Sequence, residues 1–124
     1  MENIDWVDLL FKFDGRINRG KFWAGAAASW AIAIAMGILF GIAVAINSVV
    51  VWAIVVILSI AFYVVMVWMG LAISIKRWHD RGKSGWWVLI GLVPLIGGIW
   101  ALVETGFLEG DSGPNEYGPD PLAV

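Results

Sequence analysis

The chain has 124 residues, the length of one domain, and 60% of them are hydrophobic while only 15% are charged. Soluble domains carry about 25% charged and roughly 45–50% apolar residues, so this composition, with a mean hydropathy of +0.83, excludes an ordinary water-soluble globule. The absence of cysteine excludes disulfides, thiol catalysis and thiolate metal sites.

The N-terminal residues predict a short amphipathic helix over residues 2–13. Asp5 and Asp8 fall on one face of this helix, while Trp6 and other apolar side chains gather on another. Such a helix can lie in the headgroup layer of a membrane; the alternative is a frayed terminus. Charged residues occur throughout this segment, which is not typical of a signal peptide. We expect residues 1–21 to form a cytoplasmic segment at the membrane interface.

Two transmembrane helices are predicted next. Residues 22–75 contain no charged side chain. A bilayer core requires about 20 helical residues, so this run is long enough for two crossings. Asn47 and Ser48 are its only clearly polar pair near the middle. The pattern predicts an antiparallel hairpin of helices over residues 22–46 and 49–75.

A third uncharged run, residues 84–103, is again about one bilayer long. We therefore expect a third transmembrane helix over residues 84–107. Pro94 and the Gly97-Gly98 pair predict a kink or a break near its centre. In the alternative, the segment enters the membrane and returns to the same side.

Together these segments predict an all-α integral membrane protein with three transmembrane helices after a short interfacial helix. The positions of the cations predict its orientation. All eight Lys and Arg residues lie before the first run or between the second and the third. The positive-inside rule makes that side cytoplasmic. The N-terminus is then inside, and the acidic tail over residues 108–124, rich in glycine and proline, is outside. We expect a multi-pass protein of a bacterial inner (plasma) membrane.

Small side chains recur every four residues along the first predicted helix. Gly37 and Gly41 lie in this stripe, and their spacing lets another helix approach closely. The partner is either the second helix of the same chain or the first helix of a neighbouring chain. In the second case the protein is a homo-oligomer.

The most unusual stretch, KRWHDRGKSGWW at residues 76–87, combines four cations, the only histidine and three tryptophans. Arginine holds phosphate oxygens bidentately, and lysine binds them as a point charge. We expect Arg77 and Arg81 to hold phosphate while Asp80 orients them. With the cations before the first helix, the stretch predicts a basic, aromatic cytoplasmic patch that binds anionic lipid headgroups or a partner protein. The candidate binding residues are Arg16, Asn18, Arg19, Lys76, Arg77, His79, Asp80, Arg81, Lys83 and Trp86.

The same stretch gives little support for catalysis. His79 adjoins Asp80, but neighbouring residues on a helix point about 100° apart, and no nucleophile lies beside an evident base. One histidine without cysteine excludes a histidine-based zinc site within one chain. We expect no enzyme, no metal and no cofactor, and neither nucleic acid nor a known small-molecule substrate as a partner.

Two other functional classes stay open. The first is an oligomeric transporter or channel, although ion pathways usually contain an ionisable residue and residues 22–75 have none. The second is a lipid-modifying enzyme that uses His79 and Asp80.

Three motifs carry a resemblance to one family: FDGRINRGKFW at residues 13–23, KRWHDRGKSGWW at residues 76–87 and GPNEYGPDP at residues 113–121. Together they resemble the small bacterial inner-membrane proteins of the domain of unknown function 805 family, the YhaH/YhaI-like group. The resemblance spans roughly residues 11–121. It implies a fold and a membrane location but no established activity.

The third motif predicts a fixed turn that docks on another part of the protein, because two prolines and a glycine surround Tyr117 and Asp120. With the tail outside, it cannot meet the cationic stretch. In the re-entrant alternative the tail is cytoplasmic, and Asp120 can pair with Arg77 or Arg81.

Overall fold

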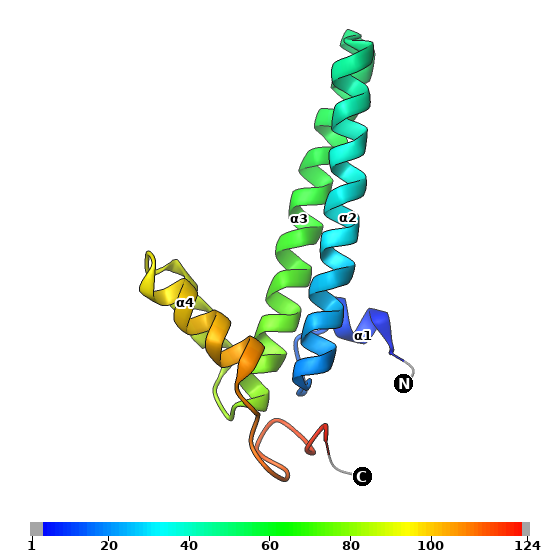
Figure 1. Ribbon diagram of the computed structural model, residues 1–124. Coiled ribbons are helices and arrows are strands. Elements are labelled where there is room, and N and C mark those ends of the chain that lie inside the picture. Colours follow the sequence, from blue (N-terminus) through cyan, green and yellow to red (C-terminus); the bar gives the residue numbers. More distant parts are fainter. Residues whose placement is uncertain (1–3, 123–124) are drawn as a thin grey trace.

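The computed structural model describes residues 4–122, and their regular structure is helical. Two long helices, α2 (Arg19–Ile46) and α3 (Val49–Asp80), lie side by side as an antiparallel hairpin (Figure 1). Within the described residues, these are the two helices that are long and apolar enough to cross a membrane. The long helices expected from the uncharged runs are therefore present, and α3 extends beyond its expected end.

Local polar contacts determine where α2 begins and ends. The Asn18 side chain accepts a hydrogen bond from the Lys21 backbone N–H at 2.8 Å, which satisfies one donor of the first turn. At the other end, Asn47 adopts a left-handed conformation with a φ of 50°, and its N–H binds the Ala43 carbonyl. Ser48 follows in extended conformation, and α3 starts at once.

Close packing between α2 and α3 is concentrated near the base of the hairpin, the end where the chain enters α2 and leaves α3. A Cβ atom on Gly25 would lie 2.9 Å from Ile73 Cγ2, so glycine permits the helices to meet there. Gly37 and Gly41 differ, because a Cβ atom on either would meet nothing within 4 Å. In the described chain these two glycines contribute no contact between α2 and α3. The structure therefore does not support the second helix of the same chain as their partner.

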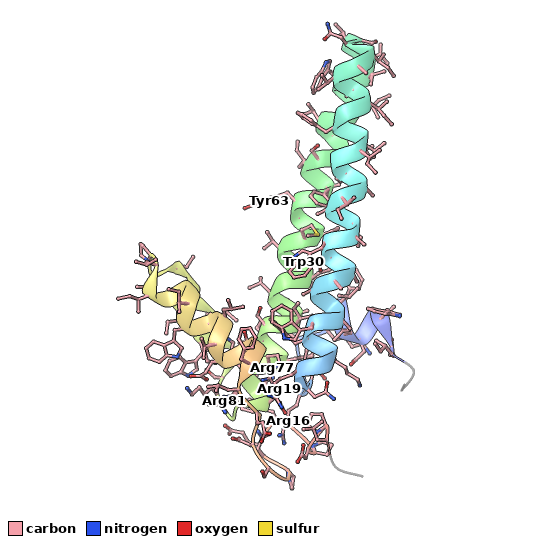
Figure 2. All side chains as sticks on the ribbon, in the orientation of Figure 1. Arg16, Arg19, Trp30, Tyr63, Arg77 and Arg81 are labelled. Carbon is pink, nitrogen blue, oxygen red and sulfur yellow. The ribbon has the colours of Figure 1, made fainter. Side chains whose placement is uncertain are left out.

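Apolar side chains cover the outside of the hairpin. Only 6% of the most apolar stretch of each long helix is buried, whereas a core helix of a soluble protein would be mostly buried. Tyr63 is 69% exposed and projects from α3 away from α2 (Figure 2). Exposed apolar surface on this scale indicates a lipid environment.

The segment over residues 84–107 is not one helix. It forms η1 (Gly85–Leu92, a 3₁₀ helix), α4 (Ile96–Leu102) and a final π-helical turn, η2 (Val103–Phe107). One arm is η1 with eight residues, and the other is the continuous stretch Ile96–Phe107 formed by α4 and η2. Both fall short of the about 20 residues that a crossing requires, so a third span is not confirmed.

The turn between η1 and α4 explains why the segment doubles back. Pro94 cannot donate a backbone hydrogen bond, and Leu95 adopts a φ of 65°. Gly97 lets the two arms come close, because a Cβ atom there would lie only 1.8 Å from the Ile90 carbonyl oxygen. The chain path is therefore the return described by the re-entrant alternative, and this short hairpin diverges from α3 (Figure 1).

The tail docks on the end of α3. The Asp111 N–H donates to the Asp80 carbonyl at 2.7 Å, and the Asn115 amide donates to the His79 carbonyl at 2.9 Å. A tail on the side opposite the cationic stretch is contradicted by these contacts. Asp120 does not pair with the arginines of α3; its carboxylate accepts backbone N–H groups of the tail itself.

The N-terminal segment completes the base. Helix α1 (Trp6–Phe11) is shorter than the helix expected over residues 2–13, and Asp5 caps its first turn. Leu9 and Leu10 enter a small core, and Trp6 stays exposed. The core residues are Leu9, Leu10, Ile17, Phe22, Met69 and Ile73. Residues 1–3 and 123–124, which the expected N-terminal segment and tail include, lie outside the described residues.

Reporter fusions test the return of the chain. We expect a truncation fusion after Arg81 and a fusion at the C-terminal end to report the same side of the membrane. A fusion after Asn47 should report the opposite side, as read by alkaline phosphatase and green fluorescent protein activities in cells. Opposite signals from the Arg81 and C-terminal fusions would mean that residues 84–107 cross.

Glycine substitutions test the packing of α2. Gly25→Leu should lower the free energy of unfolding by about 1–3 kcal/mol, because the added side chain collides with Ile73. Gly41→Leu, at an open position of the same helix, serves as the control. The measurement is denaturant unfolding in mild detergent. An equal loss in Gly41→Leu would show that Gly41 contacts another chain.

Candidate functional site

The base of the hairpin contains a buried carboxylate shared by two arginines, and Figure 2 shows the arginines gathered there. Asp80, the last residue of α3, accepts a hydrogen bond from Arg16 Nε at 3.0 Å through Oδ1. Its Oδ2 accepts from Arg77, one helical turn earlier. All three side chains are at most 5% exposed. Two positive charges and one negative charge are thus removed from water together.

Arg77 joins three separate parts of the chain to α3. Its Nε donates to the Thr105 carbonyl at 2.5 Å and its Nη2 to the Leu108 carbonyl at 2.6 Å. Nη1, which also binds Asp80, lies 3.3 Å from the Ile17 carbonyl oxygen. The planar fork of an arginine can serve these divergent acceptors, whereas a lysine ammonium cannot.

Arg16 holds the tail in the same manner. Its Nη1 donates to the carbonyls of Gly113 at 2.8 Å and Gly118 at 3.2 Å, and its Nη2 donates to the Asp111 carbonyl at 2.7 Å. With the bond from Nε to Asp80, every nitrogen of the guanidinium has a protein acceptor. The first and third sequence motifs therefore meet at one side chain.

Lys76 fixes α1 against α3. Its ammonium donates to the backbone carbonyls of Asp8 and Leu9, the latter at 2.7 Å, and the residue is 1% exposed. Carbonyls near the end of a helix carry partial negative charge, which a cation stabilises. The lysine expected to face phosphate is thus buried under α1.

A second polar cluster holds the short hairpin. Lys83 Nζ donates to Glu104 Oε1 at 2.6 Å, and Trp100 Nε1 donates to the same oxygen at 2.9 Å. Arg81 Nε lies 3.5 Å from Glu104 Oε2. Burial would raise the pKa of Glu104, but the hydrogen bonds and charges of Lys83, Trp100 and Arg81 outweigh burial and lower this pKa below its usual value. Glu104 is therefore held as an anion near neutral pH.

His79 receives the tail motif. Its ring stacks on Tyr117 with centroids 4.0 Å apart and an interplanar angle of 4°. Its Nδ1 lies 2.9 Å from the Gly15 carbonyl oxygen. Backbone hydrogen bonds between Asn115 and Gly118 close the turn that presents Tyr117. The docking turn predicted from NEYGPDP is confirmed, although Tyr117 and Asn115 make the contact rather than Asp120.

The structure brings most of the predicted site residues to one end of the molecule, but it uses many of their donors internally. Arg77 is fully buried, so a phosphate held directly by this side chain has no support in the geometry. Asn18 caps α2, and Trp86 is 78% exposed on η1. Arg19 binds the Phe107 carbonyl at 2.8 Å and is partly exposed. Among the described residues, no group of three acidic or histidine side chains is arranged to hold a metal ion.

Several partners in these clusters were not identified from the sequence. Glu104 and Trp100 were assigned to a membrane span, and most other acceptors are backbone carbonyls, which no side-chain pattern reveals. The sequence did contain one indication that Glu104 lies outside a membrane span: it is the first charged residue after the third apolar run and directly follows that run.

Comparisons with known proteins agree with this picture of a membrane protein. Residues 10–119 match the model of a family described as "Protein of unknown function (DUF805)". The chain is 30% identical to the Uncharacterized protein YiiR of Escherichia coli (strain K12) over 136 residues, covering 90% of this chain and 86% of that protein. It is 48% identical over 52 residues to the Inner membrane protein YhaI of the same strain, covering 41% and 42%.

A further relative is the Inner membrane protein YhaH of Escherichia coli (strain K12). It is 38% identical over 50 residues, covering 40% of each chain. No solved structure matches the chain.

Removal of the shared carboxylate tests the buried cluster. Asp80→Asn should lower the free energy of unfolding by about 3–5 kcal/mol, because two buried arginines lose their counter-charge. Glu116→Gln, at an exposed tail position, is the control. The measurement is thermal unfolding in detergent together with limited proteolysis of the tail. Equal stability of the two variants would mean that the arginines do not depend on Asp80.

Proposed function

The chain belongs to the DUF805 family of proteins of unknown function, and from this premise we propose that it is a non-enzymatic module of the bacterial inner membrane whose cytoplasmic face binds anionic lipid headgroups. Two relatives are named inner membrane proteins, and α2 and α3 have the length and composition of membrane spans. The headgroup contact is then made at the base of these helices.

In this proposal the chain crosses the membrane twice, and both ends are cytoplasmic. The eight Lys and Arg residues all belong to the segments at the base, and the turn at Asn47 and Ser48 has none. The positive-inside rule favours a cytoplasmic base. Exposed Trp6 and Trp86 add aromatic side chains at the same end, as is typical of a membrane–water interface.

The observation that carries the proposal is how the eight cations are used: three are satisfied inside the protein, Arg81 and Lys83 pair with Glu104, and three are exposed or partly exposed. Arg16, Lys76 and Arg77 are satisfied inside the protein. The side chains of Lys12 and Arg19 are 58% and 43% exposed, and Lys21 is partly exposed. These three exposed or partly exposed cations, Lys12, Arg19 and Lys21, follow α1 or lie in the first turn of α2. We call them the outer cations.

In the proposed orientation, the outer cations lie at the level of the anionic lipid headgroups. Each cation near a negatively charged leaflet contributes about 1 kcal/mol to association. Their ion pairs are weak: Lys12 lies 3.9 Å from Asp8, and Arg19 Nη2 lies 3.6 Å from Glu109, while Arg19 Nη1 donates to the Phe107 carbonyl at 2.8 Å. Solvent-exposed pairs of this kind contribute little, so headgroup phosphates can replace them.

The same geometry favours a binding role over catalysis or transport. His79 stacks on Tyr117, and both oxygens of Asp80 accept from arginine, which leaves the two without a shared acid–base geometry. Residues 22–75 of the two long helices have no ionisable group apart from the phenol of Tyr63, as expected for helices that do not conduct ions.

Neutralisation of the outer cations tests the proposal. The Lys12→Gln, Arg19→Gln, Lys21→Gln variant should bind anionic phospholipid at least tenfold more weakly than the wild type, about 1.4 kcal/mol or more. The measurement is titration of the detergent-solubilised full chain with phosphatidylglycerol at two salt concentrations. The control is Glu116→Gln, which neutralises an exposed acid of the tail that pairs with none of the outer cations. Wild-type affinity in the triple variant would overturn the proposal.

A further inference from the structure

The short hairpin formed by η1, α4 and η2 exposes apolar side chains along its length. At its tip, Leu92, Leu95 and Ile96 are 78%, 78% and 68% exposed. No charged residue occurs between Lys83 and Glu104, which lie at its two ends. The described chain thus leaves a large apolar surface uncovered on a second element besides the long helices, and such a surface requires an apolar partner.

The charged groups of the short hairpin are confined to its foot, where it joins the base. Lys83 precedes η1 and donates to Glu104, in the first part of η2, at 2.6 Å. Trp86, in the first turn of η1, is exposed at the same end. A helix that lies flat in the headgroup layer has a charged face along its length, which this hairpin lacks. A polar foot and an apolar tip instead indicate a segment that enters the membrane end-on.

The arms of the short hairpin have the length of one leaflet. The eight residues of η1 rise about 16 Å at about 2.0 Å per residue. The seven residues of α4 and the five of η2 together rise about 18 Å. A hydrocarbon core of about 30 Å gives each leaflet about 15 Å. The hairpin leaves α3 obliquely, with its tip directed away from the base (Figure 1), so its depth is less than its length and its tip stays within one leaflet.

The backbone of the turn suits an apolar surrounding. In lipid, backbone N–H and C=O groups have to find their partners within the protein. Pro94 has no N–H group. The N–H groups of Val93, Ile96 and Gly97 each donate to a carbonyl of the same hairpin at 2.8–3.2 Å, and Leu95 is the exception among residues 93–97. Most donors of the tip are therefore satisfied without water.

Contacts at the foot fix the short hairpin relative to the long helices. Trp23 Nε1 on α2 donates to the Gly106 carbonyl at 2.8 Å. Gly85 approaches α3 closely, since a Cβ atom there would lie 2.9 Å from Ile75 Cγ2. The oblique angle is thus set by the protein itself, and it exists before any lipid binds.

An apolar groove of about 630 Å³ lies between η1 and α3. Leu71 and Ile75 line it on α3, and Val88 and Leu89 line it on η1. Leu71 follows the exposed Val67 by about one helical turn, so the groove continues the lipid-facing surface of α3. Acyl chains that surround α3 can therefore enter the groove, and its apolar walls favour them over water.

We propose that the short hairpin is a wedge that binds acyl chains of the cytoplasmic leaflet alone. Its tip lies in the hydrocarbon of that leaflet, its foot lies at the headgroups, and an acyl chain fills the groove beside α3. The wedge adds cross-section to one leaflet, whereas α2 and α3 add cross-section to both. Its placement rests on the two-span orientation proposed above, but its binding surface includes none of the outer cations.

Fluorescence quenching in vesicles of phosphatidylcholine and phosphatidylglycerol tests the wedge. The chain has no cysteine, so Leu92→Cys creates a single attachment site for a nitrobenzoxadiazole probe at the exposed tip. Phosphatidylcholine with a nitroxide halfway along its acyl chain is exchanged into one leaflet of vesicles that hold the full chain in one orientation. The probe should lose most of its fluorescence to nitroxide in the cytoplasmic leaflet and little to nitroxide in the opposite leaflet.

Two reference positions calibrate this measurement. Ile57→Cys on α3 and Leu122→Cys in the tail replace side chains that are also exposed. Nitroxide lipid should quench the probe at Ile57, and iodide in the water should quench the probe at Leu122 but not the probe at Leu92. Quenching of the Leu92 probe by iodide would place the tip in water, and a Leu92 probe reached by neither quencher would mean that protein, such as a second copy, covers it. Either result, or equal quenching from both leaflets, would overturn the wedge.

A probe at Leu89→Cys tests the groove in the same vesicles. Nitroxide lipid in the cytoplasmic leaflet should quench this probe about as strongly as the probe at Leu92. Protection of the Leu89 probe from nitroxide lipid would exclude an acyl chain from the groove and contradict that part of the proposal.

The wedge and the proposed headgroup binding can fail separately. Titration of the variant lacking the outer cations with phosphatidylglycerol measures headgroup binding, and the Leu92 probe in the otherwise unchanged chain measures depth. Wild-type affinity in the titration together with quenching from the cytoplasmic leaflet would overturn the proposed function and support the wedge. Weakened affinity together with a Leu92 probe in water would support the proposed function and overturn the wedge.

Discussion

The Asp80 carboxylate at the end of α3 has to compensate two guanidinium groups that are removed from water. Burial of an ion costs several kcal/mol even after the protein relaxes, and the cost is recovered only when geometry and hydrogen bonds are nearly complete. This requirement explains why Arg77 reaches one carbonyl within η2 and one directly after it, and why Arg16 reaches into the tail. The loops take these paths because the buried charges need their acceptors.

The molecule is thus stabilised by different forces at its two ends. Toward the turn at Asn47, α2 and α3 bury few side chains, among them Ala43 and Val55, and expose many apolar ones, so lipid acts as their solvent. At the base, a small apolar core is surrounded by ion pairs and side-chain hydrogen bonds to backbone carbonyls. A sequence with the hydropathy of a membrane span can fold in this way only if its few charges are concentrated at one end.

The sequence predicted the parts of the fold that depend on composition along the chain. The uncharged run over residues 22–75 predicted the long hairpin, and the rigid turn around Tyr117 predicted a docked tail. It gave the return only as the alternative to a crossing, because an apolar run of one bilayer length does not by itself distinguish a crossing from a short hairpin. The sequence also did not reveal that Arg77 binds backbone carbonyls inside the protein. A cation between tryptophans gives the same sequence pattern whether it binds a lipid headgroup or a carbonyl that is distant along the chain.

The contacts of Arg77 also have a consequence for biosynthesis. Its carbonyl partners at Thr105 and Leu108 lie 28 and 31 residues further along the chain, and those of Arg16 lie still closer to the C-terminal end. A ribosome makes the chain from its N-terminus, so both arginines and Asp80 are synthesised before these acceptors exist. The base therefore cannot assemble until residues 105–118 have been made. Until then the two arginines lack the carbonyl acceptors that they bind in the folded protein.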